Sequence, residues 1–149
     1  MPELSNKPVY TIGVASELLE LSTHSLRLYE REGLILPHRT KTNRRLYSDV
    51  ELGKAGNIHN MIQEKGLNFA AIRNLLALIP CWKICCYKCV KCEHWSTFFD
   101  SDKPCWTKAE RCQKEQELCR DCPVYLESTD LIKIKHMIYP TGLEVDSKP

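Results

Sequence analysis

The chain lacks any long apolar run, and its first 80 residues contain neither cysteine nor tryptophan. No stretch reaches the roughly 20 apolar residues that a membrane-spanning helix needs, so a protein embedded in a membrane by helices is excluded. The N-terminal residues Met1–Pro8 are polar and lack the apolar core of a secretory signal peptide. We therefore expect a cytoplasmic protein without a membrane partner.

Residues grouped for acid–base or nucleophilic catalysis are also lacking. The second half of the chain contains C-x-x-C motifs, which some thiol oxidoreductases use for catalysis. These motifs do not lie in the βαβ context that is typical of such enzymes. We therefore expect that the protein is not an enzyme.

Acidic residues are absent from Pro37–Tyr47, although the whole chain has 21 basic and 19 acidic residues. The net charge of +2 is too small to indicate nucleic-acid binding. The basic residues of the acid-free stretch are Arg39, Lys41, Arg44 and Arg45. A basic run alone is most often a solvated face, so its meaning depends on what precedes it.

Two short helices precede this basic stretch. In Ile12–Leu19 the apolar residues recur at helical spacing, which predicts the first helix. Ser22 or Thr23 can cap a second helix. We expect that helix to end at Gly33, because glycine tolerates the left-handed backbone of a helix end.

A hairpin is predicted next. Leu34–Leu36 and Leu46–Tyr47 are its expected strands, and the polar, basic segment Pro37–Arg45 is its loop. Asn43 suits the turn because asparagine tolerates positive φ.

The second predicted helix has a polar outer face. Its outward-facing residues are Thr23, His24, Arg27 and Arg31. Leu26 and Tyr29 face inward. A helix-turn-helix lays such an outer face in the DNA major groove, where the planar fork of Arg27 suits guanine or phosphate. The sequence therefore predicts a winged helix-turn-helix, in which a basic hairpin reaches the adjacent DNA backbone.

Three motifs occur in order: TIGVA at residues 11–15, LRLYEREGLI at 26–35 and RRLY at 44–47. Together they resemble the DNA-binding domain of the MerR family of bacterial transcription regulators, and its heat-shock-repressor branch in particular. The resemblance covers 9–79 and implies promoter DNA as a partner, a homodimer on two half-sites, and RNA polymerase as a further partner. It also implies that promoter DNA is bent and untwisted.

The DNA-contacting residues expected from the helix face, the basic loop and this resemblance are Thr23, His24, Arg27, Tyr29, Arg39, Arg44, Arg45 and Tyr47. The resemblance places Arg44 and Tyr47 on the DNA backbone. Of Arg39 and Arg45, one is expected at the minor groove while the other stays solvated. Tyr29 is expected in the core, with its hydroxyl at the rim.

Two further helices complete the predicted domain. Ser48 and Glu51 form a capping box that opens a helix to about Glu64. Its expected buried stripe is Leu52, Ala55, Ile58, His59 and Ile62. Asn68 caps a fourth helix, which Pro80 ends.

The long dimerisation helix of the MerR family is not predicted after Pro80, because no sustained heptad pattern follows. The longest helical candidate there is Thr107–Leu118. We therefore expect a dimer that forms through the cysteine-rich region and Leu131–Tyr139. The segment Asp130–Tyr139 fits a strand or a helix equally well.

All nine cysteines lie in the second half of the chain: Cys81, Cys85, Cys86, Cys89, Cys92, Cys105, Cys112, Cys119 and Cys122. In a reducing compartment such density indicates metal or redox chemistry rather than disulfides. Cys86–Cys92 reads C-x-x-C-x-x-C, and Cys119–Cys122 reads C-x-x-C before a proline. Such spacing suits zinc or an iron–sulfur cluster, and both stay open.

Two Cys-Trp dipeptides, at Cys81 and Cys105, resemble the "two-CW" modules of anaerobic bacteria. The sequence thus predicts a mainly α protein with a winged helix-turn-helix at 9–79, a small metal- or cluster-stapled module at 81–125, and a short apolar segment and polar tail at 126–149. Its function is predicted as MerR-type transcription regulation, with cysteines that sense metal or redox state. The alternative is a DNA-binding adaptor or repressor with purely structural zinc.

Overall fold

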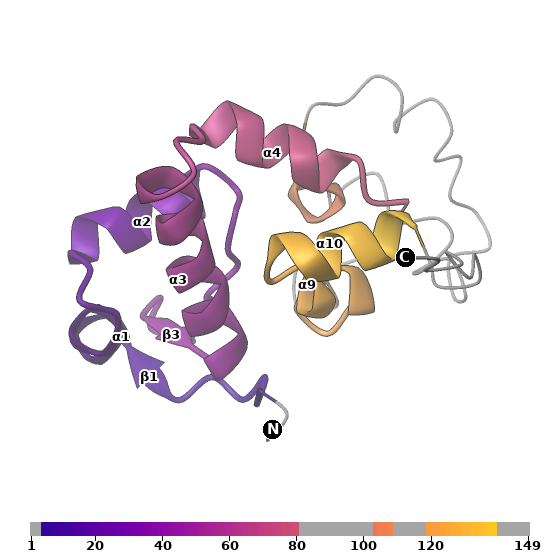
Figure 1. Cartoon of the computed structure of the whole chain (residues 1–149). Coiled ribbons are helices and arrows are strands. Elements are labelled where there is room, and N and C mark those ends of the chain that lie inside the picture. Colours follow the sequence, from indigo (N-terminus) through magenta and orange to yellow (C-terminus); the bar gives the residue numbers. More distant parts are fainter. Residues whose placement is uncertain (1–3, 81–102, 109–118, 140–149) are drawn as a thin grey trace.

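The computed structural model describes residues 4–80, 103–108 and 119–139 (Figure 1). Within them the elements are β1 (Tyr10–Thr11), α1 (Ile12–Leu19), α2 (Thr23–Arg31), β2 (His38–Arg39), β3 (Arg45–Tyr47), α3 (Asp49–Gln63), α4 (Phe69–Ala77), a 3-10 helix η1 (Cys105–Lys108), α9 (Pro123–Glu127) and α10 (Leu131–Ile138). The described part of the chain is therefore mainly helical, as predicted.

The predicted helix starts are confirmed by side-chain caps. The side chain of Ser22 accepts a hydrogen bond from the backbone N–H of Ser25, and that of Asn68 accepts from the N–H of Ala71. At α3 both halves of the capping box with Ser48 and Glu51 are present. These caps satisfy amide groups that have no partner within a helix, and they depend only on neighbouring residues.

The hairpin is present, but its first strand was predicted at the wrong place. Leu34 and Ile35 are buried in the core, and β2 is His38–Arg39 instead of Leu34–Leu36. Burial of the two apolar residues draws this stretch under the helices, so pairing begins only after Pro37, which has no N–H to donate. Asn43, with φ of 62°, forms the turn as expected.

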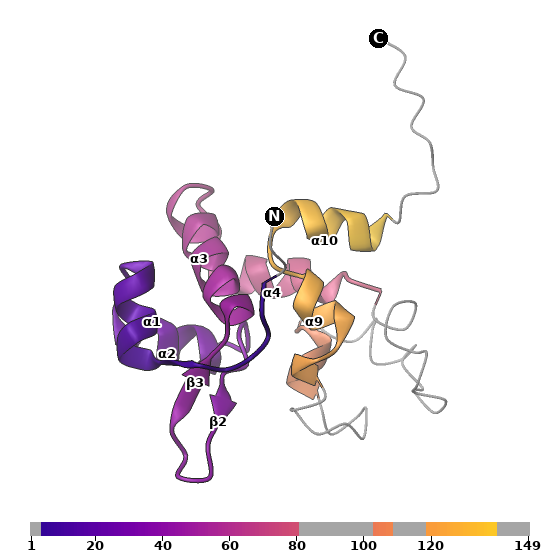
Figure 2. The same ribbon diagram turned by 90° about the horizontal axis from the view of Figure 1, so that it is seen from below.

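A three-stranded antiparallel sheet results, in the order β1–β3–β2. The strand β1 was not predicted, because only two residues pair: Tyr10 with Tyr47, and Thr11 with Leu46. We call β2, β3 and the turn 40–44 the wing. Figure 2 shows the wing projecting from the helical body.

The buried face of α3 also differs from the predicted stripe. Ala55 and Ile58 are buried as expected, but Leu52, His59 and Ile62 are only half-buried. The remaining buried residues of α3 are Val50, Glu51, Lys54 and Met61. Glu51 and Lys54 are buried because Tyr125 and Ser128, from the C-terminal part of the chain, pack against them.

The hydrophobic core extends across the predicted boundary between the winged helix-turn-helix domain (9–79) and the cysteine-rich module (81–125). Trp106, Val124, Tyr125 and Ile134 share one cluster of buried residues with the four N-terminal helices. In both Figure 1 and Figure 2, α10 lies beside α4. The ambiguity of 130–139 is settled as a helix, whose N-cap is Asp130.

The N-terminal arm is not loose over its described residues. Ser5 accepts a hydrogen bond from the N–H of Val50, and the Asn6 amide donates to the Asp121 carboxylate at 2.7 Å. The arm thus joins α3 to the turn before α9. Among the described residues, no helix is long and apolar enough to span a membrane.

Candidate nucleic-acid interface

The outer face of α2 is the exposed, cationic side of the helix-turn-helix. Leu26 and Tyr29 are buried beneath it, which fixes the rotation of the helix. His24, Arg27 and Arg31 are exposed on the opposite side. Their placement agrees with the helical spacing in the sequence, and Thr23, at the first turn, is half-buried.

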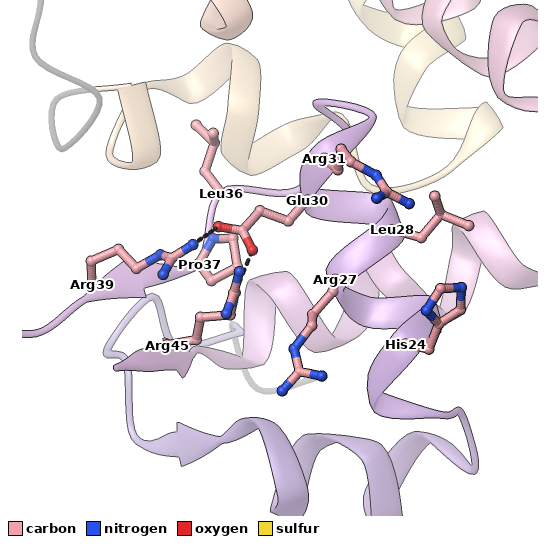
Figure 3. Close-up of a pocket in the computed structure, with 9 residues that line it drawn as sticks. All are labelled: His24, Arg27, Leu28, Glu30, Arg31, Leu36, Pro37, Arg39 and Arg45. Atoms are coloured by element: carbon pink, nitrogen blue, oxygen red, sulfur yellow. Dashed lines mark hydrogen bonds and ion pairs between the residues drawn. The ribbon is translucent and has the colours of Figure 1, made fainter. Parts of the chain in front are cut away.

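A groove of about 600 Å³ lies between α2 and the wing (Figure 3). Its lining includes three of the predicted cations from α2 and the wing, Arg27, Arg39 and Arg45, together with Leu36 and Pro37 from the connecting segment. The structure therefore brings these three predicted residues of the helix and the hairpin to a common surface.

Glu30 organises the base of this groove. Its carboxylate accepts from Arg39 at 2.9 Å and also binds Arg45, as the dashed lines in Figure 3 show. Arg27 lies nearby without an ion-pair partner among the described residues. Arg27 is therefore free of the ion pairs with Glu30 that hold Arg39 and Arg45 in place, and the same is true of Arg31, which also lines the groove.

The wing tip carries further exposed positive charge. Lys41 and Arg44 are both exposed. The turn beneath them is closed by the N–H of Thr40 donating to the Arg44 carbonyl at 2.9 Å and by the Arg44 N–H donating to the Thr40 hydroxyl at 3.1 Å. These charges thus project from an ordered turn.

The two tyrosines predicted to contact DNA lie inside the protein. Tyr47 has 0% of its surface exposed, and among the described residues its hydroxyl has no hydrogen-bond partner. Burial, and then the charge of Glu30, raise the pKa of Tyr47 to about 12. The Tyr29 hydroxyl lies 3.5 Å from Nδ1 of His59, and burial raises the pKa of Tyr29. Both tyrosines are therefore buried beneath the surface that α2 and the wing form.

Three of the predicted metal ligands fall on described residues: Cys105, Cys119 and Cys122. Cys119 is buried, and its carbonyl accepts from the N–H of Cys122 at 3.1 Å, which closes the expected turn. Within the described ranges, no three potential metal-ligating side chains form a group. The other six, Cys81, Cys85, Cys86, Cys89, Cys92 and Cys112, lie outside the described residues.

Lys54 is a buried cation that the sequence reasoning missed. It is only 2% exposed, its ammonium donates to the Ser128 hydroxyl at 2.8 Å, and it lies over the rings of Trp106 and Tyr125 at 4.7 and 4.2 Å. Desolvation lowers the pKa of Lys54 to about 7, against the opposing effect of Glu51. The sequence did contain one indication that Lys54 is buried. It lies one helical turn after Glu51 and one before Ile58, and therefore on the same face of the helix as these residues.

A helix-turn-helix with a basic hairpin wing defines a class of DNA-binding folds. Residues 10–79 match the model of the MerR HTH family regulatory proteins. The N-terminal half of this chain therefore contains a MerR-type helix-turn-helix domain.

The chain is similar to curated bacterial proteins over the same part. It is 38% identical over 71 residues to the HTH-type transcriptional regulator GlnR of Bacillus anthracis, covering 48% of this chain and 54% of that protein. It is 37% identical over 71 residues to the heat shock protein HspR of Streptomyces coelicolor, covering 48% and 47%. It is 37% identical over 67 residues to the HTH-type transcriptional regulator TnrA of Bacillus subtilis, covering 45% and 60%.

The chain thus spans about half the length of the curated relatives it matches. Their names describe transcription regulators and a heat shock protein rather than enzymes.

Proposed function

We propose that this protein is a DNA-binding transcriptional regulator of the MerR type. The observation that carries the proposal is the exposed, cationic outer face of α2, with Arg27 directly beside the groove that the wing closes (Figure 3). A recognition helix flanked by a basic wing can read a major groove while the wing contacts adjacent phosphates. The names of the relatives support the same function.

Replacing Arg27 and Arg44 together by alanine should weaken DNA binding and its dependence on salt. Each lost phosphate contact should lower the slope of log affinity against log salt by roughly one unit, because fewer counterions are released. The measurement is fluorescence anisotropy at several salt concentrations, with duplexes that the wild-type protein enriches from a random pool.

Lys135→Ala is the matched control, because Lys135 is an exposed cation on α10, outside the groove. Its removal should leave the slope unchanged. The proposal is wrong if the double variant keeps the affinity and slope of the wild type.

We also propose that the protein acts as a homodimer on promoter DNA, with RNA polymerase as its second partner in the cytoplasm. Half-sites one helical turn apart require two recognition helices. The stoichiometry of the same DNA titration tests the dimer, which predicts two chains on each enriched duplex.

For the cysteine-rich region we propose metal or iron–sulfur binding. The closed turn at Cys119–Cys122 supports the ligand spacing expected for such a site. If the bound group changes DNA affinity, the region is a sensor of metal or redox state. If the group is zinc that affects only folding, the region is a structural adaptor.

Metal analysis, together with the visible spectrum of protein purified without oxygen, separates these readings. Broad visible absorption with bound iron is expected for a cluster, whereas a colourless protein with stoichiometric zinc indicates the structural role. A colourless protein that is free of metal and still fully folded would contradict both.

A further inference from the structure

The linker 33–37, which connects α2 to the wing, is held by side chains from the other half of the chain. The indole N–H of Trp106 donates to the Gly33 carbonyl at 2.7 Å. The N–H of Leu36 donates to the Tyr125 hydroxyl, also at 2.7 Å. The linker also borders the groove, through Leu36 and Pro37 (Figure 3). Its course past the groove is therefore fixed by contacts with the C-terminal half.

A third contact reaches the wing itself. The guanidinium of Arg120 donates to Nδ1 of His38, the first residue of β2, at 2.6 Å. Arg120 lies inside the turn that Cys119 and Cys122 close. The base of the wing is thus bonded to a residue between two cysteines.

These side chains are themselves fixed against α3. The Tyr125 hydroxyl donates to the buried carboxylate of Glu51 at 3.2 Å while it accepts from the linker. The ring of Trp106 meets that of Tyr125 edge to face, with centroids 5.1 Å apart. A hydroxyl that both donates and accepts a hydrogen bond has few alternative positions. The Tyr125 hydroxyl oxygen therefore couples the linker to α3.

Gly33 shows how closely the two halves approach. A Cβ at this position would lie 2.6 Å from Cγ2 of Thr107, and the φ of Gly33 is 75°. Both the contact and the backbone conformation favour glycine.

We propose that Trp106, Arg120 and Tyr125 form a brace that positions the wing relative to α2 within one chain. Arg120 lies within the Cys119–Cys122 turn and Tyr125 lies in α9, which begins directly after it, so a change at that turn reaches the wing without passing through a second subunit. That the brace tunes DNA contact rests on the proposed function; that it orders the wing does not.

Hydrogen exchange of the DNA-free protein tests the brace directly. Tyr125→Phe keeps the ring but removes the hydroxyl bonded to Leu36 and Glu51. We expect the amides of the wing, residues 38–47, to exchange about five- to tenfold faster, because the loss of one buried hydrogen bond is of this order.

Tyr139→Phe is the matched control, because Tyr139 is 71% exposed and lies at the C-terminal end of α10. Arg120→Ala removes the contact with His38 at the half-buried edge of the brace and should accelerate the same amides. Unchanged exchange of the wing in both folded variants would overturn the brace.

A double-mutant cycle then tests the effect on DNA. In the Tyr125→Phe background, Arg44→Ala should weaken binding by a smaller factor than in the wild type, because a loosened wing already contributes less. Equal factors in both backgrounds would show that the brace does not position the wing for DNA. If the wild-type protein binds no duplex, the proposed function fails, and the exchange experiment still decides the brace.

Discussion

Trp106→Ala should be the most destabilising single substitution in the described part of the chain. Trp106 is 1% exposed, and its ring contacts both Tyr125 and the ammonium of Lys54. Truncating a buried tryptophan typically costs about 3–5 kcal/mol, through lost burial and the cavity that remains. Because domains of ordinary stability have only about 5–15 kcal/mol to lose, we expect a large drop in the urea midpoint, followed by circular dichroism.

Two variants separate the causes of this loss. Trp106→Phe keeps most of the ring but leaves the Gly33 carbonyl without its donor, so a smaller loss of about 1–3 kcal/mol is expected. Tyr139→Ala should change the free energy of unfolding by less than about 0.5 kcal/mol, because Tyr139 is exposed. A loss below about 1 kcal/mol for Trp106→Ala would show that the shared core contributes little to stability.

Lys54→Met should change how stability depends on pH. The pKa of Lys54 is about 7 in the folded protein, against an ordinary value of 10.5, because burial penalises its charged form. Between these values the unfolded chain holds more protons than the folded chain, so Lys54 makes the wild type more stable as the pH rises. Its penalty is full below pH 7 and disappears towards pH 10.5.

The measurement is the difference in unfolding free energy between the wild type and Lys54→Met from about pH 5 to about pH 10. We expect this difference to move in favour of the wild type by about 3–4 kcal/mol between pH 7 and pH 10, and to stay nearly flat below pH 6. Cysteines and tyrosines titrate in both proteins, so the subtraction removes the part of their contribution that does not depend on Lys54; Cys105, whose charge acts on the pKa of Lys54, is the exception. Lys135→Met, at an exposed position, should show no such trend, and a flat difference for Lys54→Met would contradict its burial as a cation.

The parts of the fold that the sequence predicted well depend on local chemistry. The capping box of Ser48 and Glu51, the cap at Asn68 and the turn at Asn43 each involve residues a few positions apart. The outward direction of Arg27 follows from the helical period, once Leu26 is assigned to the core. Local interactions of this kind can be read from neighbouring residues alone.

The errors arise where distant segments compete for the same residues. Leu34 and Ile35 suit a strand locally, but the core buries them and moves strand pairing to His38. No prediction was made for Lys54, which is enclosed by Ser128 and Tyr125, more than 70 positions away. The burial of Tyr47 was likewise not predicted, and its contact with DNA, which the resemblance implies, stays a prediction. No local pattern contains this information, because it belongs to tertiary packing.

The brace joins two segments of a single chain, and this has a consequence for how a dimer would respond. Trp106, Arg120 and Tyr125 each contact the linker or wing of their own head. In a dimer, the wing of each subunit would therefore respond only to the Cys119–Cys122 turn of the same subunit. One subunit could change its conformation while the other subunit does not. Such an assembly would give a graded response with a singly switched intermediate, rather than the concerted transition of subunits that share one switching element.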